Sequence, residues 1–346
     1  MNNSGGLAIL NFNGNSSVSF SGSPVLNDLY LVGLIKSNNS STVSFLSAFS
    51  ATSSFLTISG GLASFEGNYT LNNTLLSASG GVTTIPSTGG LSILNPNVNV
   101  LPQNANIELS GILSLSSGTF NVGNTSDNSS LFYESGSRIN IDGAKVNIQR
   151  ALSRVSSDNG ASVNFSLNSG TINVGIGRTS ISNRGVFDIG NSSSTFSWTN
   201  GSIYINQNSS AFSLGDYYVF ANSGTVTGGN LFFQPNLNSD VESAFNINSK
   251  QKIFNLLMVD DNGSRNPKLD LVGNSATVSG TMTLLKRGIN SNNLDIYLGG
   301  DLINNTTSSL TGFTTGSGTF SFIDGNTQYI SGSTSTTFNN IYFKNC

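Results

Sequence analysis

The sequence has little charge and no histidine. Charged residues make up 9% of the 346 positions, against about 25% in an ordinary soluble domain. The net charge is -3, so there is no basic surface to attract nucleic acid or anionic lipid, and we expect neither as a partner. With no His, the chain cannot build a Ser-His-Asp triad, a His general base or a zinc site with His ligands.

Cysteine and long apolar runs are also scarce. The single Cys346 is the last residue, which excludes an internal disulfide, and we interpret it as a chain boundary. No apolar run approaches the roughly 18 residues that a membrane-spanning helix requires, so we expect no membrane insertion. Residues 1–6 lack the basic and apolar regions of a signal peptide. Because the chain begins and ends in similar motifs, we expect it to be a segment of a longer array.

Ser, Thr, Asn and Gly take the place of the missing charges. The side chains of Ser, Thr and Asn bond to nearby backbone and disfavour helix interiors, and few stretches carry the residues that long helices prefer. Hydrophobic residues still make up 36% of the chain and recur in alternation with polar ones. Alternation with period two predicts half-buried strands and argues against disorder.

A short motif, Ser-Gly-Thr followed by alternating residues, recurs along the chain. It begins at Ser117, Ser169, Ser223, Ser279 and Ser317, with looser versions around Gly143 and Gly201. The successive glycines 118, 143, 170, 201 and 224 are 25, 27, 31 and 23 positions apart. Glycine permits a positive φ at a corner, after which the chain can enter a strand.

A repeat of this size predicts a parallel β-solenoid (β-helix) with coils of about 25 residues. We expect Asn and Ser at the corners to stack as hydrogen-bonded ladders. Tandem antiparallel β-sandwiches are the alternative, since they also use short alternating strands and frequent turns. We expect solenoid repeats over 1–234, an irregular interruption over 235–268, and further β repeats over 269–346 that continue the array. The interruption is expected to hold a short helix within 234–245 and an apolar strand within 250–259.

A longer repeat joins the two ends of the chain. Residues 11–23 and 322–333 both read as strand, Gly-Asn turn, strand and Ser-Gly-Ser corner. The run 270–345 resembles repeats of very large cell-surface and secreted proteins of Bacteroidota. The motifs that carry this resemblance are the stretches 276–284, 294–302, 318–322, 328–333 and 338–341. The resemblance implies a type IX-secreted, adhesin-like surface protein, and therefore an extracellular or cell-surface location.

The densest charge cluster comprises Glu134, Arg138, Asp142, Lys145, Arg150, Arg154, Asp158, Arg178, Arg184 and Asp188. Carbohydrate-active enzymes on β-helices place carboxylates with Arg or Lys on a shared face. Asp142, Lys145, Arg150 and Arg154 are therefore the candidates for an alternative lyase or glycosidase site. The interpretation that we favour is a solvated, salt-bridged face without catalytic residues.

Two further features have the residue types of a binding site. Residues 260–263, Asp-Asp-Asn-Gly, offer oxygen ligands but read as a plain turn, so we predict no metal site and no cofactor. Aromatic residues gather between 187 and 233; most are expected to fill the core, with Trp198 and Tyr204 exposed as candidates for carbohydrate binding. We thus expect a non-enzymatic structural or adhesive element, a stiff spacer or fibre segment with weak glycan binding. Its partners would be glycans and other segments of the same protein.

Overall fold

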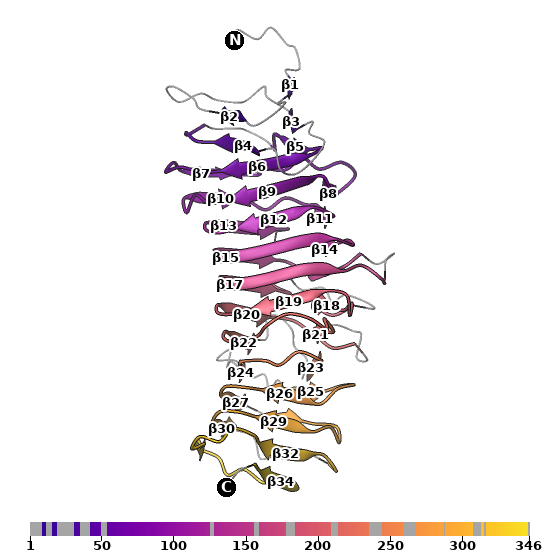
Figure 1. The fold of residues 1–346 in the computed structure, drawn as a ribbon, viewed down its shortest axis with the longest axis vertical. Helices are drawn as coiled ribbons and strands as arrows, with labels where there is room; N and C mark the ends of the chain where they lie inside the picture. Colours follow the sequence, from indigo (N-terminus) through magenta and orange to yellow (C-terminus); the bar gives the residue numbers. More distant parts are fainter. Residues whose placement is uncertain are drawn as a thin grey trace.

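The computed structural model is an all-β rod in which strands stack as rungs along the long axis from one end to the other (Figure 1). It describes the strands 9–11, 16–18 and 31–34, and then 42–49, 54–124, 128–155, 159–177, 184–208, 214–234, 244–258, 268–286, 288–306, 313–314 and 316–344. Within these residues there is no helix, and every strand pair is parallel, except for one isolated antiparallel bridge. The prediction of a parallel β-solenoid is confirmed.

Most coils contribute one strand to each of three columns, which we number in the order in which the chain passes through them. Column 1 contains β2(Ser16–Val18), β4(Thr42–Phe45), β6(Gly61–Phe65), β9(Gly89–Ile93), β12(Ile112–Leu115), the first parts of β15(Ser137–Ile148) and β17(Val163–Val174), and β19(Thr195–Trp198). Nearer the C-terminus the chain passes through β26(Ala276–Val278), β29(Ile296–Leu298), β32(Thr319–Phe322) and β34(Asn340–Phe343).

Column 2 follows across a tight corner. It contains β7(Leu71–Asn73), β10(Val98–Val100), β13(Thr119–Val122), the last parts of β15 and β17, β20(Ser202–Ile205), β22(Asn230–Phe233), β24(Asn255–Met258), β27(Met282–Lys286), β30(Leu302–Thr306) and β33(Ile330–Ser331). β15 and β17 serve both columns because each continues around the corner.

Column 3 closes the coil. Its ten-stranded sheet contains β8(Val82–Ile85), β11(Asn106–Leu109), β14(Leu131–Tyr133), β16(Leu152–Arg154), β18(Phe187–Ile189), β21(Tyr217–Val219), β23(Ala244–Ser249), β25(Lys268–Leu271), β28(Ile289–Asn290) and β31(Phe313–Thr314). A separate three-stranded sheet is formed by β1(Ile9–Asn11), β3(Leu31–Leu34) and β5(Leu56–Ile58).

The alternation of buried and partly buried residues along most strands builds one continuous core. In most strands every second side chain points inward, as in Thr119–Val122, and like residues stack on the coil above. Phe165 lies on Phe196 with ring centroids 5.3 Å apart, and Phe187 lies on Tyr217 at 5.6 Å. One coil could not bury these rings alone, so the coils stabilise one another.

The coils vary in length, so the glycines of the Ser-Gly-Thr motif do not all occupy the same position in the coil. Leu113 pairs with Ile139, 26 positions later, whereas Phe165 pairs with Phe196, 31 later, and Met282 with Leu302, only 20 later. Gly118, Gly143, Gly170 and Gly201 all lie at the corner between columns 1 and 2. The corresponding glycine of the next coil is Gly229, which directly precedes β22.

The Ser-Gly-Thr copies at 223 and 317 occupy a different corner. Gly224 lies between β21 of column 3 and Val226, which bridges to Trp198 of column 1, and Gly318 precedes β32 of column 1. The motif marks the start of a strand, but it does not mark one fixed place in the coil.

Within the expected interruption, the described residues 244–258 carry β23 and β24, which continue columns 3 and 2. The apolar strand expected within 250–259 is present as β24. The expected helix, over most of its length, and the turn at 260–263 lie outside the described residues, and the division into 1–234, 235–268 and 269–346 stays a prediction.

Candidate functional site

The four residues of the alternative enzyme site are distributed around one coil. Asp142 is exposed at the corner between columns 1 and 2, where its Oδ1 accepts a hydrogen bond from Ser169 Oγ at 3.2 Å. Lys145 is exposed on the outer side of column 2, and Arg150 is partly buried between columns 2 and 3. Arg154 belongs to column 3. The structure does not bring these side chains to one shared face.

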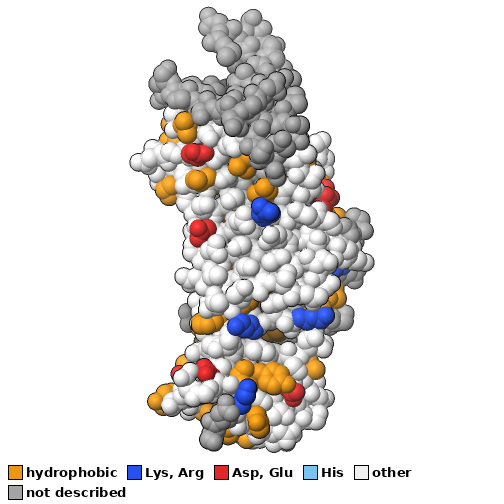
Figure 2. Space-filling view, in the orientation of Figure 1, with side chains coloured by type: hydrophobic (Ala, Val, Ile, Leu, Met, Phe, Trp, Pro, Cys, Tyr) orange, Lys and Arg blue, Asp and Glu red, His pale blue; other side chains and the backbone are white. Residues whose placement is uncertain are grey.

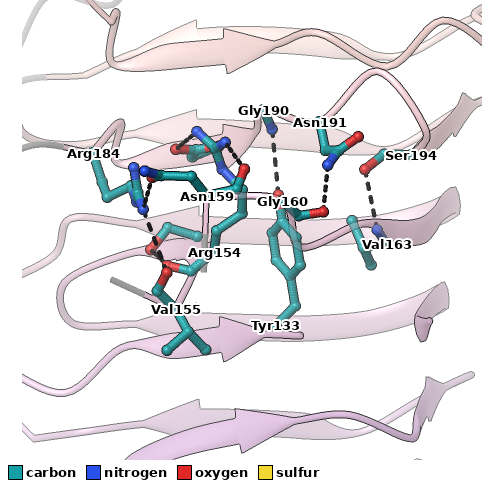
Figure 3. A network of polar contacts seen from close by, with 12 residues as sticks. Tyr133, Arg154, Val155, Asn159, Gly160, Val163, Arg184, Gly190, Asn191 and Ser194 are labelled. Carbon is teal, nitrogen blue, oxygen red and sulfur yellow. Dashed lines mark hydrogen bonds and ion pairs between the residues drawn. The ribbon is translucent and has the colours of Figure 1, made fainter. Parts of the chain in front are cut away.

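Arg154 forms a salt bridge with Asp188 of the next coil, and Figure 3 shows Arg154 with its neighbours. The guanidinium donates two hydrogen bonds to the carboxylate, from Nε to Oδ1 and from Nη2 to Oδ2, both 3.1 Å long. The Asp188 side chain is fully buried and that of Arg154 nearly so. A bidentate pair of this kind is strong and directional, and it engages both carboxylate oxygens. Asp158 and Arg178, which the sequence placed in the same cluster, lie outside the described residues.

Further hydrogen bonds surround this pair and involve Arg154, Arg184 and Tyr133 (Figure 3). Arg154 Nη1 donates to the backbone oxygen of Asn159 at 2.8 Å, and Arg184 Nη2 donates to Asn159 Oδ1 at 2.6 Å. The Tyr133 hydroxyl accepts a hydrogen bond from the Gly190 N–H at 3.3 Å. We call the set Tyr133, Arg154, Asn159, Arg184 and Asp188 the arginine clamp. It fastens the segment after β16 to column 3.

The electrostatics of the arginine clamp fit a structural role. Burial raises the pKa of Asp188, while the Arg154 guanidinium opposes that rise. Burial also lowers the pKa of Arg154, but the Asp188 carboxylate outweighs it, so the pKa of Arg154 lies above its ordinary value. Each buried charge therefore has its counter-charge within hydrogen-bond distance.

Two buried tyrosines predict loss of stability in alkali. Burial raises the pKa of Tyr217, and it raises that of Tyr133 with a further contribution from Asp188. These phenols ionise near pH 10 in the unfolded chain but resist ionisation in the folded one, so below pH 10 they do not lower the free energy of unfolding. Above pH 10 each of the two tyrosines should lower the free energy of unfolding by about 1.4 kcal/mol per pH unit. Denaturant unfolding at pH 9, 10 and 11 measures this loss. Tyr217→Phe should flatten the dependence, and an unchanged slope in that variant would contradict the assignment.

The expectation that Trp198 is exposed is wrong. The side chain is completely buried and packs edge-on against Phe196, with ring centroids 6.2 Å apart. In β19 the residues Phe196 and Trp198 are two apart, so both point to the core side of the strand. Gly229 of the next coil leaves room for the indole, since a Cβ there would lie 2.1 Å from Trp198 Nε1.

Tyr204 is only partly buried and lies on the outer side of column 2. Its ring stacks on Phe232 of the next coil, with centroids 4.4 Å apart and planes 7° from parallel. One ring face is therefore covered. Because the stack follows the solenoid axis, the ring edge and hydroxyl are what Tyr204 can present to a ligand, and a sugar could not lie flat on the covered face.

A ladder of asparagine amides runs along the outer side of column 2 toward Tyr204. Its members donate from Nδ2 to the Oδ1 of the preceding coil: Asn99 to Asn72 at 2.6 Å, Asn121 to Asn99 at 3.3 Å, Asn147 to Asn121 at 2.8 Å, and Asn173 to Asn147 at 2.9 Å. We call these five residues the amide ladder. The sequence predicted such ladders at corners, but this one lies within strands. The overlooked signal was Asn followed by Val or Ile at 99, 121, 147 and 173.

Charged side chains are few on the face of the rod that Figure 2 shows. The face is mostly white, with a few blue and red side chains and scattered orange ones. Within the described residues, no group of three or more Asp, Glu or Cys side chains is placed to hold a metal ion. The same residues include no helix long and apolar enough to cross a bilayer. No protein-family model, no curated protein sequence and no solved structure matches this chain.

Proposed function

We propose that this chain is a stiff structural and adhesive segment of a bacterial cell-surface or secreted repeat protein. The observation that carries the proposal is the unbroken stacking in column 2. Its register-paired positions run coil by coil through Asn73, Val100, Phe120, Val146, Ile172, Ile203, Leu231, Leu256, Met282, Leu302 and Ile330. All of them are buried except Ile330 at the C-terminal end of the column. A column with a shared core and a ladder of backbone hydrogen bonds at every step resists bending at any single point.

The surface chemistry supports the same role. Hydroxyl and amide groups cover a rod that has few charges, and such a surface suits a spacer that meets many neighbours without strong electrostatic attraction. The extracellular location rests on the resemblance of 270–345 to bacterial surface repeats. An antibody raised against the purified chain should label intact cells of the source organism. Labelling only after permeabilisation would contradict that location.

Spin labels placed along column 2 test the stiffness. Asn72, Ser202 and Tyr329 directly precede Asn73, Ile203 and Ile330, which share the column 2 register. Ten steps separate 72 from 329 and five separate 202 from 329. At about 4.8 Å per step, pulsed electron resonance should give narrow distances near 48 Å and 24 Å.

The labels require Asn72→Cys, Ser202→Cys and Tyr329→Cys, combined in pairs in a Cys346→Ser background so that only the chosen sites react. Two narrow distributions in a ratio near two support a rigid rod. A broad distribution for the longer pair, beside a narrow one for the shorter pair, would show a hinge between 72 and 202 and would overturn the stiff spacer.

A further inference from the structure

The amide ladder retains hydrogen-bonding capacity toward solvent. A carboxamide has two N–H donors and an oxygen with two lone pairs. Asn147 donates one N–H to Asn121 and accepts one from Asn173, so one N–H and one lone pair remain. Asn173 donates to Asn147 and is followed in the next coil by Tyr204, which replaces the amide with a phenol. Asn121 donates to both Asn99 Oδ1 and the Val100 backbone oxygen, so it keeps only acceptor capacity. The ladder thus offers polar groups at regular steps along the solenoid axis, as an acceptor alone at Asn121.

The spacing of these groups indicates the shape of the ligand. Neighbouring coils lie about 4.8 Å apart, so the ladder presents one amide for each such advance. An extended β-1,4-linked polysaccharide advances by a similar length per sugar and carries hydroxyl groups on every residue. A compact sugar would meet only one or two rungs, whereas an extended chain aligned with the axis would meet them all.

The low charge of this face restricts the chemical class of the ligand. The outer positions that flank the ladder in its last three coils are Thr119, Lys145 and Thr171, so a single ammonium group stands beside five neutral amides. One cation gives little attraction for nucleic acid or an acidic polysaccharide. There is likewise no charge pattern here for an acidic or basic peptide. A neutral ligand rich in hydroxyl groups is the complement of this surface.

We propose that the outer face of column 2, from Asn72 to Tyr204, binds an extended neutral polysaccharide that lies along the solenoid axis. The ladder amides donate to and accept from its hydroxyl groups, and Tyr204 adds its hydroxyl and ring edge at one end. This inference deepens the adhesive role proposed above and rests on it, but it does not depend on how stiff the rod is.

Affinity electrophoresis in gels that contain a polysaccharide tests the proposal. Hydroxyethyl cellulose supplies a soluble, neutral β-1,4-glucan; dextran is neutral with a different linkage and shape; alginate is extended but anionic. The chain should be retarded in hydroxyethyl cellulose and should run unchanged in dextran and alginate. No retardation in hydroxyethyl cellulose, or equal retardation in alginate, would overturn the proposal.

A matched pair of variants locates the binding face. Asn147→Ala with Asn173→Ala removes two rungs and should weaken binding at least tenfold. Asn140→Ala with Ser166→Ala alters two outer positions of column 1 that pair with each other in the same strands, β15 and β17, and should change binding less than twofold. Equal losses in both variants would place the binding elsewhere and refute the assignment to column 2.

A second pair of variants distinguishes loss of binding from loss of folding. Thr171→Glu leaves all ladder amides in place and adds a bulky charge beside Asn147 and Asn173, whereas Asn164→Glu adds it on column 1 in the same strand. Binding should fall only for Thr171→Glu. Circular dichroism and the spin-label distances near 48 Å and 24 Å establish that each variant keeps the rod. If the distances persist while glucan binding is absent from the unaltered chain, the stiff spacer stands and the ligand proposal fails alone.

Discussion

Gly170→Ala is expected to destabilise the central coils by about 3 kcal/mol or more. Gly170 has a φ of +90°, which a residue with a side chain adopts only with strain of about 1 to 3 kcal/mol. An added Cβ would also lie 2.4 Å from the backbone oxygen of Ala144 in the preceding coil. Backbone atoms cannot swing aside as a side chain can, so overpacking should add about 1 to 3 kcal/mol.

Variants at two other glycines distinguish backbone strain from overpacking. Gly136 has a φ of +85° and open space around the position of a Cβ, so Gly136→Ala should show the conformational strain alone. Gly325 has neither a positive φ nor a close neighbour, and Gly325→Ala should stay within about 0.5 kcal/mol. Because a solenoid can open in segments, hydrogen exchange of each coil is the suitable measurement. A loss for Gly170→Ala no greater than for Gly136→Ala would show that coil contact at this corner is unimportant.

Asp188→Ala is expected to cost about 3 to 5 kcal/mol, because it leaves the buried Arg154 guanidinium without its counter-charge. Arg154→Met with Asp188→Leu should recover much of that loss, since replacing a buried ion pair by apolar groups of similar size is often neutral. The recovery of stability should be incomplete, because the double variant also loses the hydrogen bond from Arg154 to the Asn159 backbone oxygen. Denaturant unfolding of Arg154→Met, Asp188→Leu and the double variant gives the coupling energy between the two side chains.

The Lys268–Asp270 pair provides the control. Its N–O distance is also 3.1 Å, but the Lys268 side chain is 41% exposed. Exposed pairs contribute about 0 to 1 kcal/mol, so Lys268→Met should change stability very little. A cost for Asp188→Ala as small as that for Lys268→Met would mean that the arginine clamp is not a stabilising element of column 3.

Several features of this protein follow from local properties of the chain. Alternation of apolar and polar residues needs only the two-residue period of a strand, and it correctly predicted an all-β chain. Glycines about 25 positions apart indicated the corners of successive coils, because a corner with positive φ favours glycine whatever the rest of the fold. The absence of His excluded whole classes of catalytic site in the same way.

The side that a residue faces, and the partners it meets, were decided by coil stacking. Coils of 20 to 35 residues cannot be aligned by counting, so the sequence could not place Asn121 beside Asn147, or Arg154 beside Asp188 across 34 positions. The same uncertainty allowed Trp198 to be assigned to the surface, although its strand turns it toward Phe196. By itself the sequence determined strands, corners and a repeat. The tertiary structure decided the buried ion pair and the outer amide ladder, because both are contacts between coils whose spacing depends on every loop between them.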